Sequence, residues 1–201
     1  MNKLMKQGLI WLGAATITFS LMACDAFGGR SHRLFTPQGY LVERVSDGDT
    51  LVLKSPDGKK FTVRFACIDA PEIPHSLKEK NSKITKNVNQ FAWGMKAKIR
   101  IEELIKQTDG HVNLNITDSD SEALLQADRY GRKIAEVRLK DGTFLQQVLV
   151  KEGLAKVYRS YLSKCPSKDI VQQAEAQAQQ QRIGIWGDRK FIDPWDYRKS
   201  K

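Results

Sequence analysis

The sequence predicts a small, closed β-barrel with helices packed around it, in the α+β class. Five or so short strand-like segments follow one another as a meander, and tight turns such as residues 47–49 and 56–58 join them. Segments with helical periodicity interrupt this meander, an order that favours a barrel over a parallel sheet. At 201 residues the chain is long enough to bury one sizeable core.

The first 23 residues predict an export signal rather than part of the fold. Lys3 and Lys6 precede an apolar run over residues 9–23, which is shorter than the about 20 residues of a membrane span. The run ends in Leu21-Met22-Ala23-Cys24, which resembles a bacterial lipobox and predicts a lipid anchor on Cys24. An ordinary cleaved signal and an uncleaved anchor are the alternatives. We expect a membrane-anchored lipoprotein facing the periplasm or the cell exterior, with residues 24–38 as a tether.

Strand signals begin at residue 39. Residues 40–45 and 50–53 predict two strands, and Pro56-Asp57-Gly58 predicts a hairpin turn. The returning strand is predicted over residues 61–68, where Phe61, Val63, Phe65 and Cys67 would share one face.

The second half of the chain mixes helices and strands. A basic loop is expected over residues 74–86, and a helix over 87–106 with an apolar face of Val88, Phe91, Ala92, Met95 and Ile99. Residues 111–117 and 132–139 predict an antiparallel pair, joined by an acidic loop at 118–128. Thr143 and Gln146 predict a capping box for a short helix ending at Gly153. The last predicted helix covers residues 167–182.

The charge balance limits the classes of partner. A formal net charge of +10 and a pI near 9.5 favour polyanions, either nucleic acid or an anionic membrane surface. No cysteine or histidine cluster has the spacing of a zinc site. Cys67 and Cys165 could form a disulfide outside the cytoplasm, or Cys67 could be a reduced, buried side chain.

Three spans hold residues with the chemistry of a catalytic site. Asp47-Gly48-Asp49-Thr50 and Asp69-Ala70-Pro71-Glu72 each place two carboxylates at a strand end, and Asp128-Arg129-Tyr130-Gly131-Arg132 precedes a third strand. A hard cation binds several oxygen ligands, and phosphodiester cleavage needs a positioned water, a base and arginines on the phosphate oxygens. Each span alone is typical of a turn, but together they could supply all of these groups.

In these motifs the chain resembles the thermonuclease family, typified by staphylococcal nuclease, over roughly residues 40–187. The resemblance continues through the segments Gly153-Leu154-Ala155-Lys156-Val157-Tyr158, Ala174-Glu175-x-x-Ala178 and Gly184-Ile185-Trp186. It implies a five-stranded OB-type barrel with three helices at residues 39–187, a calcium-dependent nuclease site, and a tail at 188–201. DNA is the implied substrate and RNA a further candidate, the implied products carry 3′-phosphates, and a monomer is expected.

The resemblance also implies a role for each matched residue. Asp49, Asp69 and the carbonyl of Ala70 would bind calcium, and Glu72 would orient or deprotonate the attacking water. The other implied roles are phosphate binding by Arg64 and Arg132, a neighbouring carboxylate at Asp47, and nucleotide contacts by Tyr130 and Tyr161.

Two features depart from this reading. Side chains alternate along a strand, so Arg64 and Asp69 would face opposite sides unless a bulge or turn re-aims one of them. Arg159 stands where the family's type member has a tyrosine. The alternative function is a non-catalytic OB-type module that binds single strands by charge and stacking.

Overall fold

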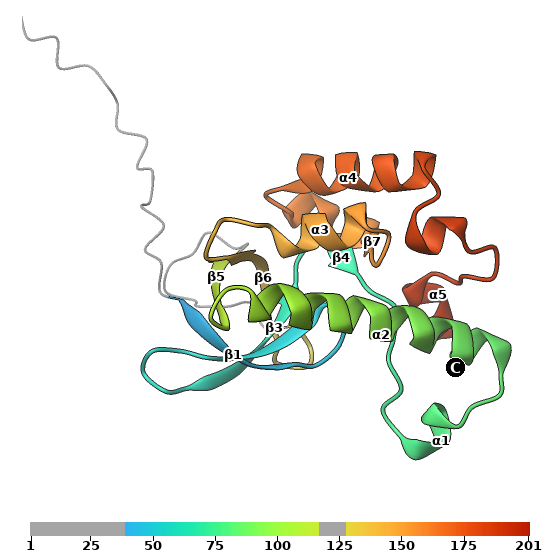
Figure 1. The fold of residues 1–201 in the computed structure, drawn as a ribbon, viewed down its shortest axis with the longest axis horizontal. Helices are drawn as coiled ribbons and strands as arrows, with labels where there is room; N and C mark the ends of the chain where they lie inside the picture. Colours follow the sequence, from blue (N-terminus) through green and yellow to red (C-terminus); the bar gives the residue numbers. More distant parts are fainter. Residues whose placement is uncertain (1–38, 117–127) are drawn as a thin grey trace, which may run out of the picture. The chain divides into compact units, whose positions relative to one another are not determined.

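The computed structural model describes residues 39–116 and 128–201, and it contains the predicted closed barrel (Figure 1). The five barrel strands are β1 (Tyr40–Val45), β2 (Thr50–Lys54), β3 (Lys60–Phe65), β5 (His111–Ile116) and β6 (Lys133–Leu139). Their order around the barrel is β1-β2-β3-β6-β5, and only the β3–β6 pair among them is parallel. The α+β class and the five-stranded OB-type architecture are therefore confirmed.

A second, two-stranded sheet lies beside the barrel. It pairs β4 (Ile68–Asp69) with β7 (Lys156–Val157) in antiparallel register, with Asp69 opposite Lys156. The core runs continuously from the barrel into this sheet, because Leu51, Phe65 and Ile68 are all buried in one cluster. This small sheet carries Asp69 to the barrel's edge.

The helices lie outside the barrel, and the second and third along the chain pack directly on its strands (Figure 1). They are α1 (Leu77–Lys80), α2 (Thr85–Lys106), α3 (Leu145–Lys151), α4 (Lys168–Gln180) and α5 (Pro194–Lys199), with 3₁₀ turns η1 (Arg159–Lys164) and η2 (Gly184–Gly187). The three predicted helices correspond to α2, α3 and α4. Residues 74–86, predicted as a loop, instead contain α1, whose first turn is capped by the Ser76 side chain.

The predicted apolar face of α2 is wrong except at Phe91, which is buried as predicted. Val88, Met95 and Ile99 are exposed, whereas the buried residues are Gln90, Phe91, Gly94, Ala97, Ile101, Leu104 and Ile105. The helix lies so close to the chain at Pro71 and Glu72 that small residues, not large ones, must face it. A Cβ atom on Gly94 would stand 2.2 Å from the Glu72 carbonyl oxygen.

The strand predicted over residues 61–68 is also wrong at its end. β3 stops at Phe65, and a turn at Ala66 and Cys67 separates it from β4. Cys67 has a φ of 72°, in the left-handed region that non-glycine residues seldom adopt. Because of this turn, the side chains of Arg64 and Asp69 no longer follow the alternation of one regular strand and can face the same side.

The predicted capping box is absent from α3. Its N-cap residue is Phe144, with no side-chain hydrogen bond. Gln146 is instead fully buried, where it accepts a hydrogen bond from the Val137 amide and donates one to the Ala135 carbonyl. Gln146 therefore satisfies buried backbone groups of β6 instead of capping the helix.

Cys67 and Cys165 form a disulfide, which decides between the two alternatives left by the sequence. The bridge ties the turn between β3 and β4 to the end of η1. It therefore links the segment that carries Arg64 and Asp69 to the segment that carries Tyr161.

Replacing both cysteines with alanine is expected to lower the free energy of unfolding by about 2–5 kcal/mol. The bridge closes a loop of 98 residues, so its loss frees much of the unfolded chain. Urea unfolding of the double variant measures the loss, and the wild type in reducing agent is the control. Equal unfolding midpoints for oxidised and reduced wild type would contradict this expectation.

Some predictions concern residues outside the described part of the chain. These are the export signal at 1–23, Cys24, the tether at 24–38 and most of the acidic loop at 118–128. Among the helices of residues 39–116 and 128–201, none combines the length and apolar character of a membrane span.

Candidate active site

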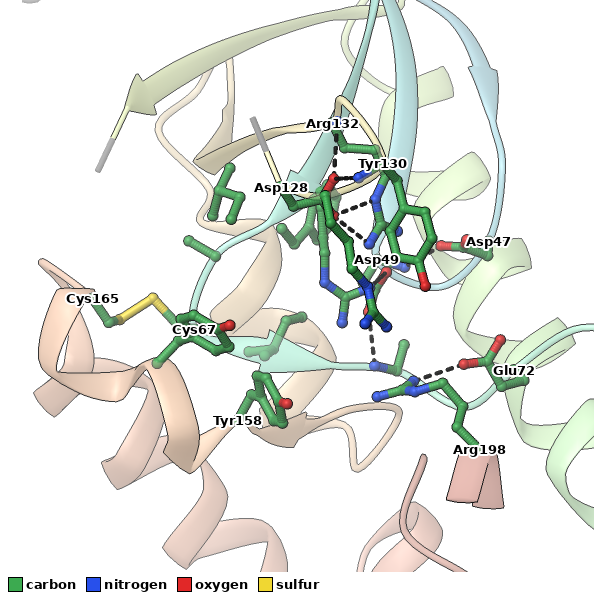
Figure 2. A pocket seen from close by; sticks show the side chains of 18 of the residues that line it. Asp47, Asp49, Cys67, Glu72, Asp128, Tyr130, Arg132, Tyr158, Cys165 and Arg198 are labelled. Carbon is green, nitrogen blue, oxygen red and sulfur yellow. Dashed lines mark hydrogen bonds and ion pairs between the residues drawn. A yellow bond between two sulfur atoms is a disulfide. The ribbon is translucent and has the colours of Figure 1, made fainter. Parts of the chain in front are cut away.

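A pocket of about 820 Å³ opens where the barrel, the β3–β4 turn and the C-terminal helix meet (Figure 2). Its walls bring together most of the residues singled out in the sequence, namely Asp47, Asp49, Arg64, Ala70, Glu72, Tyr130, Arg132 and Tyr161. Asp69, also predicted, is fully buried directly behind this wall. All the predicted site residues of the described chain therefore lie at one place.

Arg64 is the centre of the pocket's charge network. Its Nη1 atom lies 3.0 Å from Asp49 Oδ1, and its Nη2 atom lies 2.6 Å from Asp69 Oδ1. Burial lowers the pKa of Arg64, but the charges of Asp49 and Asp69 outweigh burial and raise it above its ordinary value. The turn at Cys67 thus brings Arg64 and Asp69 together, although their spacing along one regular strand would have separated them.

Asp49 is held in place by backbone and small side chains. Its Oδ2 atom accepts a hydrogen bond of 3.0 Å from the Ala70 amide, so the two acid-rich spans are joined directly. Gly48 permits this approach, since a Cβ atom there would stand 2.8 Å from the side chains of both Ala70 and Ala97. The Asp-Gly-Asp motif therefore needs its glycine for packing against the second span.

Glu72 lies at the rim of the pocket, where its side chain is 23% exposed. Its backbone is pressed against Gly94 of α2, which fixes where the side chain starts. Its carboxylate accepts a 2.7 Å hydrogen bond from Arg198, and His75 lies 4.0 Å away. A partly exposed carboxylate at a pocket rim can reach both a bound ligand and water.

Arg132 and Tyr130 lie across the pocket from Arg198 (Figure 2). Asp128 orients Arg132 through contacts of 2.6 and 2.8 Å to its guanidinium, and it accepts backbone hydrogen bonds from Tyr130 and Arg132. These contacts, led by the Arg132 side-chain hydrogen bond, outweigh burial and hold the pKa of Asp128 below its ordinary value. Tyr130 is 67% exposed, and the guanidinium groups of Arg129 and Arg132 lie 4.8 and 5.4 Å from its ring centroid.

Aromatic side chains form another wall. Tyr158 has ring-centroid distances of 5.5 Å to Tyr161 and 5.8 Å to Trp195. Arg159 turns away from this wall to pair with the buried Glu175. The wall therefore consists of Tyr158 and Tyr161, with Trp195 packed against Tyr158, and Arg159 does not replace a ring in it.

The carboxylates of the pocket are crowded. Burial and the nearby charge of Asp49 raise the pKa of Asp47 to about 7. Burial also raises the pKa of Asp69, although Arg198 and Arg64 oppose this effect. The pocket therefore holds buried negative charge that Arg64 and Arg198 do not fully offset. A hard cation bound there would reduce this repulsion.

Asp47→Asn is expected to raise the melting temperature of the metal-free protein at pH 8 by about 3–6 °C. The folded protein holds the Asp47 proton more tightly than the unfolded chain does, so this group lowers stability as pH rises from 3.8 to about 7. Thermal melts in chelator at pH 8 and pH 4.5 measure the effect. A gain as large at pH 4.5, where Asp47 is protonated, would contradict this explanation.

The donor set fits calcium better than a soft metal. Carboxylate and carbonyl oxygens from Asp49, Asp69 and Ala70 are the ligand types that hard divalent cations prefer. Another buried group consists of residues whose side chains can bind metals, namely Cys67, Glu136 and Cys165. Its two cysteines line the same pocket. Its two sulfur atoms are joined in the disulfide, so it does not offer thiolate ligands.

Sequence reasoning missed Arg198. It lies in the segment treated as a tail, and its guanidinium contacts both Asp69 and Glu72. The only signal was an arginine in an aromatic, proline-containing stretch, and no spacing rule connects that stretch to residues more than 100 positions earlier.

Carboxylates and arginines thus alternate around a pocket on an OB-type barrel. Residues 62–188 match the family described as staphylococcal nuclease homologues. The chain belongs to this family.

Curated relatives agree with this assignment. The chain is 31% identical over 160 residues to an uncharacterized endonuclease of Haemophilus influenzae, a match covering 80% of this chain and 72% of that protein. It is 31% identical to endonuclease YncB of Bacillus subtilis, covering 75% of this chain and 63% of the relative. For the staphylococcal-like nuclease CAN1 of Arabidopsis thaliana the identity is 26%, covering 85% and 41%.

Proposed function

We propose that this protein is a calcium-dependent nuclease that hydrolyses phosphodiester bonds in DNA, with RNA as a second substrate, and leaves 3′-phosphates. The observation that carries the proposal is the convergence of Asp49, Glu72, Arg64 and Arg132 on one pocket, with Asp69 paired to Arg64 behind its wall. Family membership and relatives named as endonucleases support the same reaction class.

Asp49, Asp69 and the Ala70 carbonyl would hold the calcium ion. When bound, calcium supplies Lewis-acid polarisation of the phosphate and lowers the pKa of a nearby water. Arg64 and Arg132 would bind the phosphate oxygens and stabilise the charge that develops on them. In this arrangement Arg64 must share its guanidinium between the carboxylates and the phosphate.

Glu72 would accept a proton from the attacking water. The water oxygen forms a bond to phosphorus while the bond from phosphorus to the 5′ oxygen breaks. The 5′ oxygen leaves and takes up a proton from solvent, so the phosphate stays on the 3′ side. The rim position of Glu72 is suited to this role because its carboxylate faces both the pocket and solvent.

The aromatic wall supports a nucleic-acid substrate with unpaired bases. Base stacking on an aromatic ring is sequence-tolerant, and Tyr161, 54% exposed, offers such a surface. Lys164 also lines the pocket and adds positive charge for the phosphate backbone.

Incubation of the purified protein with single-stranded DNA, in calcium or in chelator, tests the proposal. We expect cleavage only with calcium, and end-group analysis should find 3′-phosphates. Calcium-independent binding of DNA without cleavage would contradict the nuclease proposal. It would instead favour the alternative function, a non-catalytic module that binds single strands.

We also propose that the protein is exported and anchored in a membrane through a lipid on Cys24. The lipobox-like sequence supports this proposal, and a disulfide is typical of compartments outside the cytoplasm. Metabolic labelling with a radioactive fatty acid should mark the wild type but not a Cys24→Ser variant. Equal labelling of both, or of neither, would contradict the anchor.

A further inference from the structure

The C-terminal helix α5 places an arginine among the predicted catalytic carboxylates. The Arg198 Nη1 atom lies 2.7 Å from Glu72 Oε1 and 3.2 Å from Asp69 Oδ1, and Nη2 lies 2.5 Å from Asp69 Oδ2. Figure 2 shows this side chain pointing toward Glu72 from the side of the pocket opposite Arg132. The residue lies beyond position 188, where the match to the family ends.

Helix α5 is fixed to the body of the protein by its other side chains. Tyr197 is fully buried, donates a 3.1 Å hydrogen bond to Asn87 and packs edge-on against Phe91. Asp193, just before the helix, pairs with Lys156 at 2.6 Å. Because both anchors lie within the five residues that precede it, Arg198 reaches the pocket from a rigid support.

One guanidinium bridges two carboxylates of different function. Asp69 is fully buried and would bind the metal, whereas Glu72 is at the rim and would act on water. The planar fork of arginine can hold both carboxylates in one geometry, which a lysine ammonium cannot do. The bridge thereby fixes the distance between the metal ligand and the base.

We propose that Arg198 is a positioning residue of the active site, which holds Glu72 in register with Asp69. This inference rests on the proposed nuclease function. It has a second consequence, because the positive charge of Arg198 on Asp69 also opposes the binding of a cation there. Removing Arg198 should therefore slow the reaction and, at the same time, strengthen calcium binding.

The test compares Arg198→Ala with wild type in two measurements. Steady-state cleavage of single-stranded DNA at saturating calcium gives kcat and KM, and calorimetric titration without DNA gives the calcium dissociation constant. We expect kcat to fall about 100-fold with little change in KM. We expect calcium to bind about fivefold more tightly, because a neighbouring positive charge has been removed.

Two further variants separate geometry from charge. Arg198→Lys keeps the charge but cannot bridge the carboxylates, so kcat should fall nearly as far while calcium affinity stays near that of wild type. Arg189→Ala, exposed on the same C-terminal segment, is the matched control and should change neither quantity.

The outcomes distinguish this inference from the function on which it rests. If calcium-dependent cleavage occurs but Arg198→Ala keeps the wild-type kcat, the positioning role is wrong and the nuclease stands. Slower cleavage together with weaker calcium binding would show general damage to the site and would also overturn the role. A wild type without calcium-dependent cleavage would overturn both proposals.

Discussion

Replacing Glu72 with glutamine is expected to slow phosphodiester cleavage by about 10²- to 10⁴-fold, the usual contribution of a positioned general base. Glutamine keeps the size of the side chain and can still accept a hydrogen bond from Arg198, but it cannot take a proton from water. Because Glu72 lies at the pocket rim, the fold should be unaffected, and the melting temperature should change little.

Single-turnover cleavage of a single-stranded oligonucleotide at saturating calcium measures this effect. Glu102→Gln is the control, since Glu102 lies on α2, 3.6 Å from Lys98, and does not line the pocket. If Glu72→Gln cleaved at the wild-type rate, the residue would have no part in activating water.

Replacing Arg64 with alanine is expected to affect both stability and activity. Its side chain is 18% exposed and pairs with Asp49 and Asp69, so its loss leaves two buried carboxylates without their shared partner. Breaking a buried ion pair in this way costs about 3–5 kcal/mol. Loss of a phosphate-stabilising group should also slow cleavage by about 10²- to 10³-fold.

Urea unfolding and cleavage rates measure the two effects separately. Arg64→Lys retains the charge, so it should fold even if the alanine variant does not, yet it should still cleave slowly because lysine lacks the planar fork. Arg44→Ala, on the exposed side of β1, serves as the control. Full activity in Arg64→Lys would show that the site needs only a charge at this position.

Local patterns in the sequence were sufficient for much of the fold. The turn at Pro56-Asp57-Gly58 and the alternation in residues 111–117 predicted strands that the structure contains, the latter as β5. Helix α2 was predicted by its length and periodicity, but its buried face was wrong. Which face is buried depends on how closely Gly94 and Ala97 approach the segment around Glu72 and Gly48, and hydrophobicity along the helix does not encode that distance.

The site was predictable where motifs were local and was missed where it depended on tertiary structure. Asp49, Asp69 and Arg132 lie in short motifs, so their types and spacing pointed to them. The convergence of Arg64 with Asp69 required the left-handed conformation of Cys67, which the sequence does not signal because the residue is not glycine. Arg198 reaches the pocket only because Tyr197 buries α5 against α2.

In the proposed function, Asp49 and Asp69 bind the calcium that cleavage requires. The most direct test is the cleavage rate of wild type and Asp69→Asn as a function of calcium concentration, with single-stranded DNA as substrate. Asparagine retains the shape of the side chain but removes its charge. We predict a saturable calcium dependence in the wild type that moves to at least about tenfold higher calcium in the variant. The same calcium dependence in both proteins would contradict this account.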